Sequence, residues 1–265
     1  MHTYKWLALE TSTDLLSLAV ASSHGDASQV WAHTSAGGAK SSQLVLPEIV
    51  QLMEDAHMRF EELTAVVFGK GPGSFTGLRT ACSVAQGLAY GAGVPVLPID
   101  TLLAVAEDAR FQNTQQQQQQ LQQQQTIQQI VKPPKDTQRF FVAMDARMDQ
   151  VYTAAYEWQS GWHCVQAPSV NSPEGISVPM QWKDQNFTTV GNAWDAFSAR
   201  WPIAFSGKHM HAMPTAQALL RLAPVAFEQG LAVTPEDALP IYIRDKVAQT
   251  TQEREQIKLA STMSI

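Results

Sequence analysis

The chain has 265 residues, 45% of them apolar, and a formal net charge of −6. This composition is typical of a globular protein large enough for one large or two small domains. The negative net charge and the lack of any Lys/Arg run exclude this chain as the main binding surface for a nucleic acid. No stretch stays apolar for the roughly 18 residues that a membrane span requires, so we expect a cytoplasmic protein. Cys82 and Cys164 have no metal-binding or redox spacing and are expected to be reduced thiols.

The first 110 residues alternate between strand and helix patterns. YKWLALE, LLSLAVAS and SQVWAHT read as three strands joined by polar turns, and residues 41–57 carry apolar side chains at helical spacing. The β-branched run TAVVFG then predicts a buried strand, followed by helix 76–91, strand VPVLPI and helix 100–110. This order predicts a mixed five-stranded sheet flanked by helices, the ribonuclease-H-like unit from which two-lobed actin-like α/β proteins are built.

A glutamine tract follows the first lobe. Residues 112–129 contain 13 glutamines, so we expect 111–138 to be a mobile insertion without a function, although a long helix is the competing interpretation. RFFVAMDA and VYTAAYEW predict a hairpin that opens a smaller, reduced second lobe over residues 139–249. That lobe is expected to include strand FTTVGN, a helix over 193–201, and a helix over 215–229 kinked at Pro224. Residues 250–265 read as a polar tail.

The glycine-rich stretch GKGPGSFTGLR, residues 69–79, does not match any nucleotide or nucleophile motif. Its only Gly-Lys pair is followed by glycine, so it is not a P-loop, and its glycines do not give the dinucleotide or GxSxG spacing. A structural turn is the favoured interpretation. A weak anion contact at Ser74 and Thr76 is the alternative, because a helix N-terminus has free N–H groups.

The other candidate for phosphate contact is the turn after the first strand, with Glu10, Thr11 and Ser12. A nucleotide clamp would need a matching Asp-x-Gly turn from the second lobe, and the corresponding VGNA at 190–193 has no carboxylate. A polar hairpin turn is therefore the favoured interpretation of ETST. A stand-alone actin-like ATPase or kinase remains the alternative, and it would depend on Glu10.

Helices 41–57 and 76–91 are apolar on more than one face. One face of each can meet the sheet, and the rest calls either for burial within the chain or for a partner protein, with the two helices forming half of a four-helix bundle. Leu44, Leu46 and Val50 are left over once one face of the first helix has met the sheet. The residues that we expect at a partner interface are Leu44, Val45, Ile49, Leu78, Ala81, Cys82, Ala85 and Gln86.

Several motifs together resemble the bacterial TsaB family. They are ALETST, GPGSFTGLR, GLAYGAGVPVLPIDTL, MDARMDQVY, VGNAW and IYIRDKVA, so the resemblance covers nearly the whole chain apart from the glutamine tract. It implies a two-lobed actin-like (ASKHA) fold and a heterodimer with the catalytic subunit TsaD. It also implies recruitment of the ATPase TsaE and a role in placing threonylcarbamoyl on N6 of adenosine 37 in tRNAs that decode ANN codons.

Catalysis by this chain is not expected. TsaD-like paralogues carry His-x-x-x-His after the strand equivalent to VPVLPI, and this chain has Thr101 and Val105 there, which cannot replace imidazole ligands. The resemblance therefore implies a scaffold that needs no cofactor or metal of its own, with ATP and a divalent metal on the partner subunits. A weaker homodimer is expected in isolation, and tRNA contact is expected only through the complex, with a minor contribution from Arg147 and Arg244. A peptidase function lacks both a nucleophile elbow and a metal pair.

Overall fold

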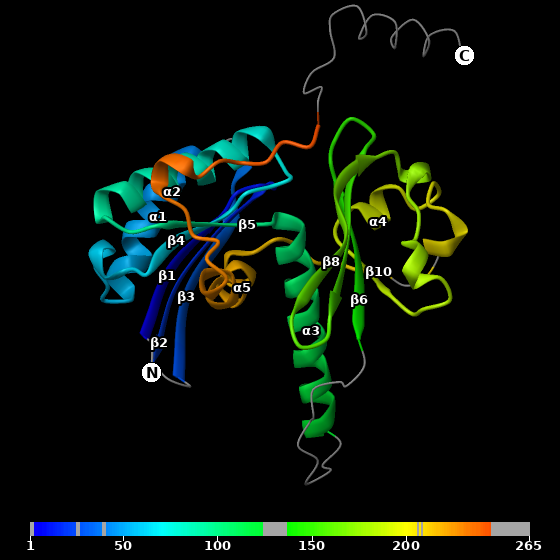
Figure 1. The fold of residues 1–265 in the computed structure, drawn as a ribbon, viewed down its shortest axis with the longest axis horizontal. Coiled ribbons are helices and arrows are strands. Elements are labelled where there is room, and N and C mark those ends of the chain that lie inside the picture. The colour runs from blue at the N-terminus through cyan, green and yellow to red at the C-terminus, as the bar shows by residue number, and fades with distance from the viewer. Residues whose placement is uncertain are drawn as a thin grey trace, which may run out of the picture.

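The computed structural model describes residues 3–24, 27–38, 41–123, 137–205, 207 and 209–244. They form two five-stranded sheets with a long helix, α3, between them (Figure 1). The strands of the first sheet are β1 (Thr3–Glu10), β2 (Leu15–His24), β3 (Ala27–Ala36), β4 (Ala65–Gly69) and β5 (Val96–Ile99). Those of the second are β6 (Gln138–Asp145), β7 (Val151–Trp158), β8 (Trp162–Asn171), β9 (Thr188–Val190) and β10 (His209–Met210).

The two sheets have the same connectivity. In the order β3-β2-β1-β4-β5, the first two pairings are antiparallel and the last two are parallel. The order β8-β7-β6-β9-β10 repeats this pattern of directions in the second sheet. Each half is therefore a ribonuclease-H-like unit, and the predicted two-lobed actin-like α/β fold is confirmed.

The helices cover the sheets unequally. Their bounds are α1 (Ser41–Asp55), α2 (Phe75–Ala92), α3 (Thr101–Gln123), α4 (Ala193–Ala196) and α5 (Ala216–Glu228). Short 3-10 turns are η2 (Phe60–Glu62), η3 (Pro173–Gly175), η4 (Met180–Trp182), η5 (Ile203–Phe205) and η6 (Pro235–Asp237). The predicted helix over 193–201 is only the single turn α4, because Trp194 and Phe197 enter an aromatic core with Phe205 in place of a helical repeat.

The alternation of side chains along β1 separates two cores. Leu7 and Leu9 point to the side of α1 and α2, where they join the apolar stripes of both helices. Trp6 and Ala8 point to the opposite face, which α5 covers with Leu219 and its neighbours. The centre of the first sheet is therefore buried on both faces.

Helix α5 belongs to the first lobe rather than to the second. The sequence assigned residues 139–249 to one smaller lobe, but α5 packs on β1, β2, β4 and β5 of the first sheet. After it, Val233 pairs with Val96 at the edge of that sheet. The second lobe is thus smaller than expected, because the chain returns to the first sheet after β10.

Helix α3 is longer than predicted and serves both lobes. Leu102, Val105 and Ala109 pack on the second sheet, whereas Ala104 lies in the core under α5. The helix continues through Gln123, so residues 111–123 are helical. The expectation of a mobile insertion is therefore wrong for these residues, and the alternative of a long helix is correct. Glutamine is a fair helix former, and α3 is already nucleated by its packed first turns. Residues 124–136 and the expected tail 250–265 lie outside the described residues.

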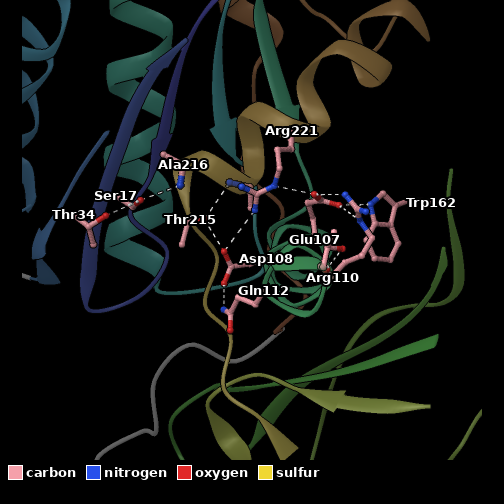
Figure 2. A network of polar contacts seen from close by, with 12 residues as sticks. Ser17, Thr34, Glu107, Asp108, Arg110, Gln112, Trp162, Thr215, Ala216 and Arg221 are labelled. Atoms are coloured by element: carbon pink, nitrogen blue, oxygen red, sulfur yellow. Dashed lines mark hydrogen bonds and ion pairs between the residues drawn. The ribbon is translucent and has the colours of Figure 1, made fainter. Parts of the chain in front are cut away.

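A buried carboxylate joins α3 to both lobes (Figure 2). Glu107 is 2% exposed and accepts hydrogen bonds from Nε and Nη2 of Arg110, from Nε of Arg221 and from Nε1 of Trp162. Arg221 lies on α5 of the first lobe, and Trp162 begins β8 of the second. Asp108, beside it, accepts from Thr215 at the start of α5. These contacts fix the two lobes relative to α3.

Candidate functional site

The glycine-rich stretch connects β4 to α2 and packs against the turn between β1 and β2. Ser74 is the N-cap of α2, and its N–H donates to the carbonyl oxygen of Ser12 at 2.7 Å. The Thr11 hydroxyl donates to the carbonyl oxygen of Gly77, also at 2.7 Å. A Cβ on Gly77 would lie 1.8 Å from the carbonyl oxygen of Thr11, so only glycine allows this approach.

Two of the five residues predicted to contact an anion line a cleft, and three do not. Ser12 and Ser74 line the cleft between the lobes. Glu10 and Thr11 are 1% exposed and lie beneath the turn, where Oε1 of Glu10 accepts from the Ser12 N–H at 2.7 Å. Thr76 is exposed on α2 outside the cleft.

Glu10 is therefore a buried structural carboxyl in this fold. Burial raises its pKa above the usual value of 4.5, and hydrogen bonds with Ser12, Thr101 and Thr11 only partly offset that rise. A group that burial holds towards its neutral form, away from the cleft, is poorly suited to hold a metal ion or phosphate. The structure gives no support to the nucleotide contact that the ATPase alternative assigned to it.

The opposite wall of the cleft is the turn between β6 and β7. This turn is the second lobe's equivalent of the β1–β2 turn, because β6 and β7 repeat β1 and β2. The sequence analysis had instead named the VGNA segment at 190–193 as the counterpart of the β1–β2 turn. Arg147 in this turn pairs with Asp14 in the first, at 2.5 Å between Nη2 and Oδ2, so an exposed ion pair crosses the cleft. In the VGNA segment, Asn192 supports the β6–β7 turn through its Oδ1, which accepts a hydrogen bond from the N–H of Asp145.

The β6–β7 turn has an unusual backbone. Arg147, Met148 and Asp149 have φ values of 60°, 54° and 61°, three successive residues in the left-handed region without a glycine. Asp145 holds the turn by accepting from the N–H of Arg147 at 2.7 Å. Arg244, from the last described segment, donates to the carbonyl oxygens of residues 146 and 147 at 2.9 and 3.2 Å. Sequence patterns gave no sign of this strained conformation.

The structure buries most of the residues that the sequence analysis placed at a partner interface. Six of its eight residues are buried inside the chain, where they hold α1 and α2 on the first sheet or under the C-terminal segment: Val45, Ile49, Leu78, Ala81, Cys82 and Ala85. The amide of Gln86 and the thiol of Cys82 both donate to the carbonyl oxygen of Ala238. Leu44 and Gln86 are both partly exposed, but only Gln86 is tied to the C-terminal segment. The most apolar stripe of each helix faces the sheet, so the stripe cannot also face a partner.

A different set of residues forms the outward side of these helices, here called the outer face. On α1, Leu46 is 48% exposed and Val50 is 46% exposed, one helical turn apart. On α2, the outward positions carry small residues and one exposed tyrosine: Thr80, Ser83, Gly87, Tyr90 and Gly91. A Cβ added to Gly87 or Gly91 would meet no atom within 4 Å. The fold of this chain therefore gives no reason for glycine at either position.

Thr101 and Val105, which the sequence analysis compared with a metal-binding histidine pair, both have roles in packing. The Thr101 hydroxyl accepts the N–H of Gly71 at 3.0 Å, and Val105 is buried against the second sheet. Among the described residues, no three His, Cys, Asp or Glu side chains converge on a common point. Within the same ranges, no helix is long and apolar enough to cross a membrane.

Known proteins resemble this chain over nearly its whole length. The chain is 29% identical over 252 residues to the tRNA threonylcarbamoyladenosine biosynthesis protein TsaB of Escherichia coli K12, covering 91% of this chain and 95% of that one. The solved structure titled YeaZ from Pseudomonas aeruginosa has a TM-score of 0.70 and 30% identity, over 90% of this chain and 99% of that one. The chain belongs to the TsaB (YeaZ) family.

Other matches agree with membership of the TsaB family. The Haemophilus influenzae protein named TsaB is 29% identical over 256 residues, covering 93% of this chain and 96% of that one. Residues 23–120 match the family model described as tRNA N6-adenosine threonylcarbamoyltransferase. That range runs from the end of β2 through α3 and includes the glycine-rich stretch with α1 and α2. The segment shared with the transferase family thus carries the outer face of this TsaB-family chain.

Proposed function

We propose that this chain is a non-catalytic scaffold subunit in the N6-threonylcarbamoylation of adenosine 37 in ANN-decoding tRNAs. Two relatives that match it over nearly their whole length are named for threonylcarbamoyladenosine biosynthesis in tRNA. In this proposal the chain forms a heterodimer with the catalytic subunit TsaD and helps to recruit TsaE. ATP and a divalent metal act on those partners, in the cytoplasm.

The observation that carries the proposal is the uncovered outer face of α1 and α2. Leu46 and Val50 expose nearly half of their surface, and burying each in a partner is favourable by about 1 kcal/mol. Gly87 and Gly91 cost helix stability and are not required for packing inside the chain. Small residues on a helix surface allow the backbone of a second helix to approach closely. The outer face therefore suits two helices from another subunit.

The family model supports a partner of related architecture. Residues 23–120 resemble the transferase family itself, so TsaD is expected to present its own pair of helices at the equivalent position. Two related pairs of helices would then meet across a pseudo-two-fold axis and complete a four-helix bundle. A second copy of this chain can present the same surface, which accounts for the weaker homodimer expected without TsaD.

The assignment of tRNA to the partners follows from charge. The chain has a net charge of −6, and Arg147 is already paired with Asp14. Binding of a polyanion needs unpaired cationic side chains in numbers that displace counterions. Arg147 and Arg244 are therefore proposed only as minor supporting contacts within the assembled complex.

Reconstitution tests the function directly. Formation of N6-threonylcarbamoyladenosine is measured with TsaD, TsaE, tRNA and threonylcarbamoyl-adenylate, with and without this chain. We expect little product when the chain is omitted and restoration when it is added back. Full activity without the chain would contradict the scaffold role.

A matched pair of variants tests the interface. Val50→Glu places a charge on the outer face, whereas Val30→Glu places the same charge on edge strand β3, at a valine that is 48% exposed compared with 46% for Val50. We expect Val50→Glu to weaken copurification with TsaD at least tenfold, because it desolvates an unpaired carboxylate, and Val30→Glu to leave it unchanged. Charges at Leu78 or Ala85 would instead disrupt the fold, because both are buried. The interface assignment is wrong if Val50→Glu folds and still copurifies like the original chain.

A further inference from the structure

The two sheets have four edges, and three of them are protected against pairing with a further strand. At the β5 edge, Val96 and Val233 of the C-terminal segment exchange hydrogen bonds of 3.0 and 2.8 Å. Strand β10 is only two residues long. Strand β8 contains Pro168, which has no N–H to donate, and it pairs with β7 across a bulge. Covering segments, short strands, prolines and bulges are the means by which proteins prevent pairing at a sheet edge.

The fourth edge, β3, has none of these features. Its ten residues pair with β2 in one continuous register, and they include no proline, lysine, arginine or carboxylate. Strand β3 occupies the same place in the first sheet as β8 does in the second. Within the described ranges, no segment pairs with its outer side. A long, regular and uncharged edge of this kind is a template for another strand.

One hydrogen bond fixes which main-chain groups of β3 point outward. The N–H of Gly37 donates to the carbonyl oxygen of Asp14 at 2.9 Å, one step beyond the last pair of the β2–β3 register, Leu15 with Ala36. Opposite residues in an antiparallel pair alternate between hydrogen-bonded and non-bonded pairs. The odd-numbered residues of β3 therefore bond to β2, and the even-numbered residues direct their N–H and C=O groups away from the sheet. These outward residues, all exposed, are Ser28, Val30, Ala32, Thr34 and Ala36.

The outward residues are arranged symmetrically about Ala32. A second copy can pair antiparallel with this edge so that Ala32 lies opposite Ala32. Val30 then lies opposite Thr34 of the second copy. Ser28 lies opposite Ala36 in the same way. In this register all five outward residues exchange main-chain hydrogen bonds with the second copy, so every free group along the edge is used.

The side chains favour the same register. Registers centred on Trp31 or His33 leave one outward residue of each copy without a strand partner. In the register centred on Ala32, the β-branched side chains of Val30 and Thr34 face each other on one side of the sheet, a favourable cross-strand pair. On the other side, Trp31 lies opposite His33. No pair places like charges opposite each other, so the edge is complementary to itself.

We propose that β3 pairs with β3 of a second copy of this chain, antiparallel and centred on Ala32. The two first sheets then form one continuous sheet of ten strands. This pairing does not use Leu46 or Val50 and is therefore distinct from any contact through the outer face of α1 and α2. Where the proposed scaffold role also holds, one such dimer carries two partner subunits.

Cysteine crosslinking tests the register. The full chain carries Cys164→Ser, because Cys164 is exposed whereas Cys82 is buried. Ala32→Cys places one thiol opposite its own copy, within reach of a short bismaleimide. Ala36→Cys is the matched control, an exposed alanine on the same strand that lies about 27 Å from its own copy at 3.4 Å per residue. We expect Ala32→Cys to form crosslinked dimers at least tenfold faster than Ala36→Cys. Equal rates, or no dimer of Ala32→Cys at millimolar concentration, would overturn the proposal.

Sedimentation equilibrium separates this dimer from pairing through the outer face. The Val50→Glu chain should still dimerise, and adding Ala32→Pro should weaken its dimerisation at least tenfold. Proline removes an outward N–H from each copy, whereas the odd-numbered groups keep their bonds to β2. Ala32→Ser retains that N–H and is the control. A monomeric Val50→Glu chain, or equal dimerisation with Ala32→Pro and Ala32→Ser, would contradict the β3 pairing.

The proposed scaffold role is measured separately. Ala32→Pro alone should copurify with TsaD as the original chain does, because the outer face is unchanged. The β3 dimer and the TsaD interface can therefore fail independently. If Ala32→Cys in a mixture with TsaD becomes crosslinked to TsaD in place of a second copy, the edge belongs to a partner strand and self-pairing is refuted.

Discussion

Substitution by alanine should change the stability of the chain in opposite directions at two glycines of α2, Gly87 and Gly77. Gly87→Ala introduces a methyl group into open space, with no atom within 4 Å. Alanine is preferred over glycine in a helix interior by about 1 kcal/mol, so the free energy of unfolding should rise by about that amount. Gly77→Ala gains the same preference but places its Cβ 1.8 Å from the carbonyl oxygen of Thr11.

The cost at Gly77 follows from the contacts that must separate. An acceptable Cβ contact requires the β1–β2 turn to move by more than 1 Å, because Cβ atoms do not approach other heavy atoms within 3.0 Å. That displacement strains or breaks the two 2.7 Å hydrogen bonds from Thr11 to Gly77 and from Ser74 to Ser12. Each is worth about 1 kcal/mol, and overpacking adds about 2 kcal/mol. After the gain in helix preference, Gly77→Ala should lower the free energy of unfolding by about 3 kcal/mol.

Urea denaturation of the full chain, followed by tryptophan fluorescence, measures both changes. The midpoints of the two variants should move in opposite directions from that of the original chain, with similar dependence on urea concentration. If both variants shift the same way, or if Gly77→Ala is as stable as the original chain, the close packing of the turn on α2 is wrong.

Two further predictions concern buried carboxyl groups. Glu107→Gln should lower the free energy of unfolding by about 3 kcal/mol, because it leaves Arg110, Arg221 and Trp162 without their shared acceptor. The control is Glu61→Gln at an exposed position. Equal urea midpoints for the two variants would refute the prediction. The pKa of Glu10 is raised above 4.5 in the folded chain, so its contribution to stability is complete below pH 4.5 and is lost as pH rises through the folded-state pKa. The difference in unfolding free energy between Glu10→Gln and the original chain should therefore shift in favour of the variant as the pH rises above 4.5, and parallel pH profiles would contradict this.

Strong local patterns in the sequence were sufficient for much of the fold. The apolar run in β1 and the helical spacing in α1 arise from burial in the core of the first lobe, so they predicted these elements, and the order of the elements predicted the ribonuclease-H-like unit of a two-lobed fold. The sequence did not reveal β8, which contains Pro168 and pairs with β7 across a bulge, because such a strand does not alternate regularly. It also placed α5 in the wrong lobe, because periodicity shows that a helix has an apolar face but not which sheet that face covers.

The sequence by itself determined the family, the element order of the first 110 residues and the structural role of the glycine-rich stretch. Only the tertiary structure decided which side chains remain available to a partner or ligand. Val45 and Ala85 were expected at an interface, yet they are buried, because the most apolar face of a helix packs on its own sheet first. Ser12 and Arg244, separated by more than 200 residues, share one cleft because the chain returns from α5 across the start of α2. Exposure and long-range proximity are properties of the packed chain, and no local pattern of residues encodes them.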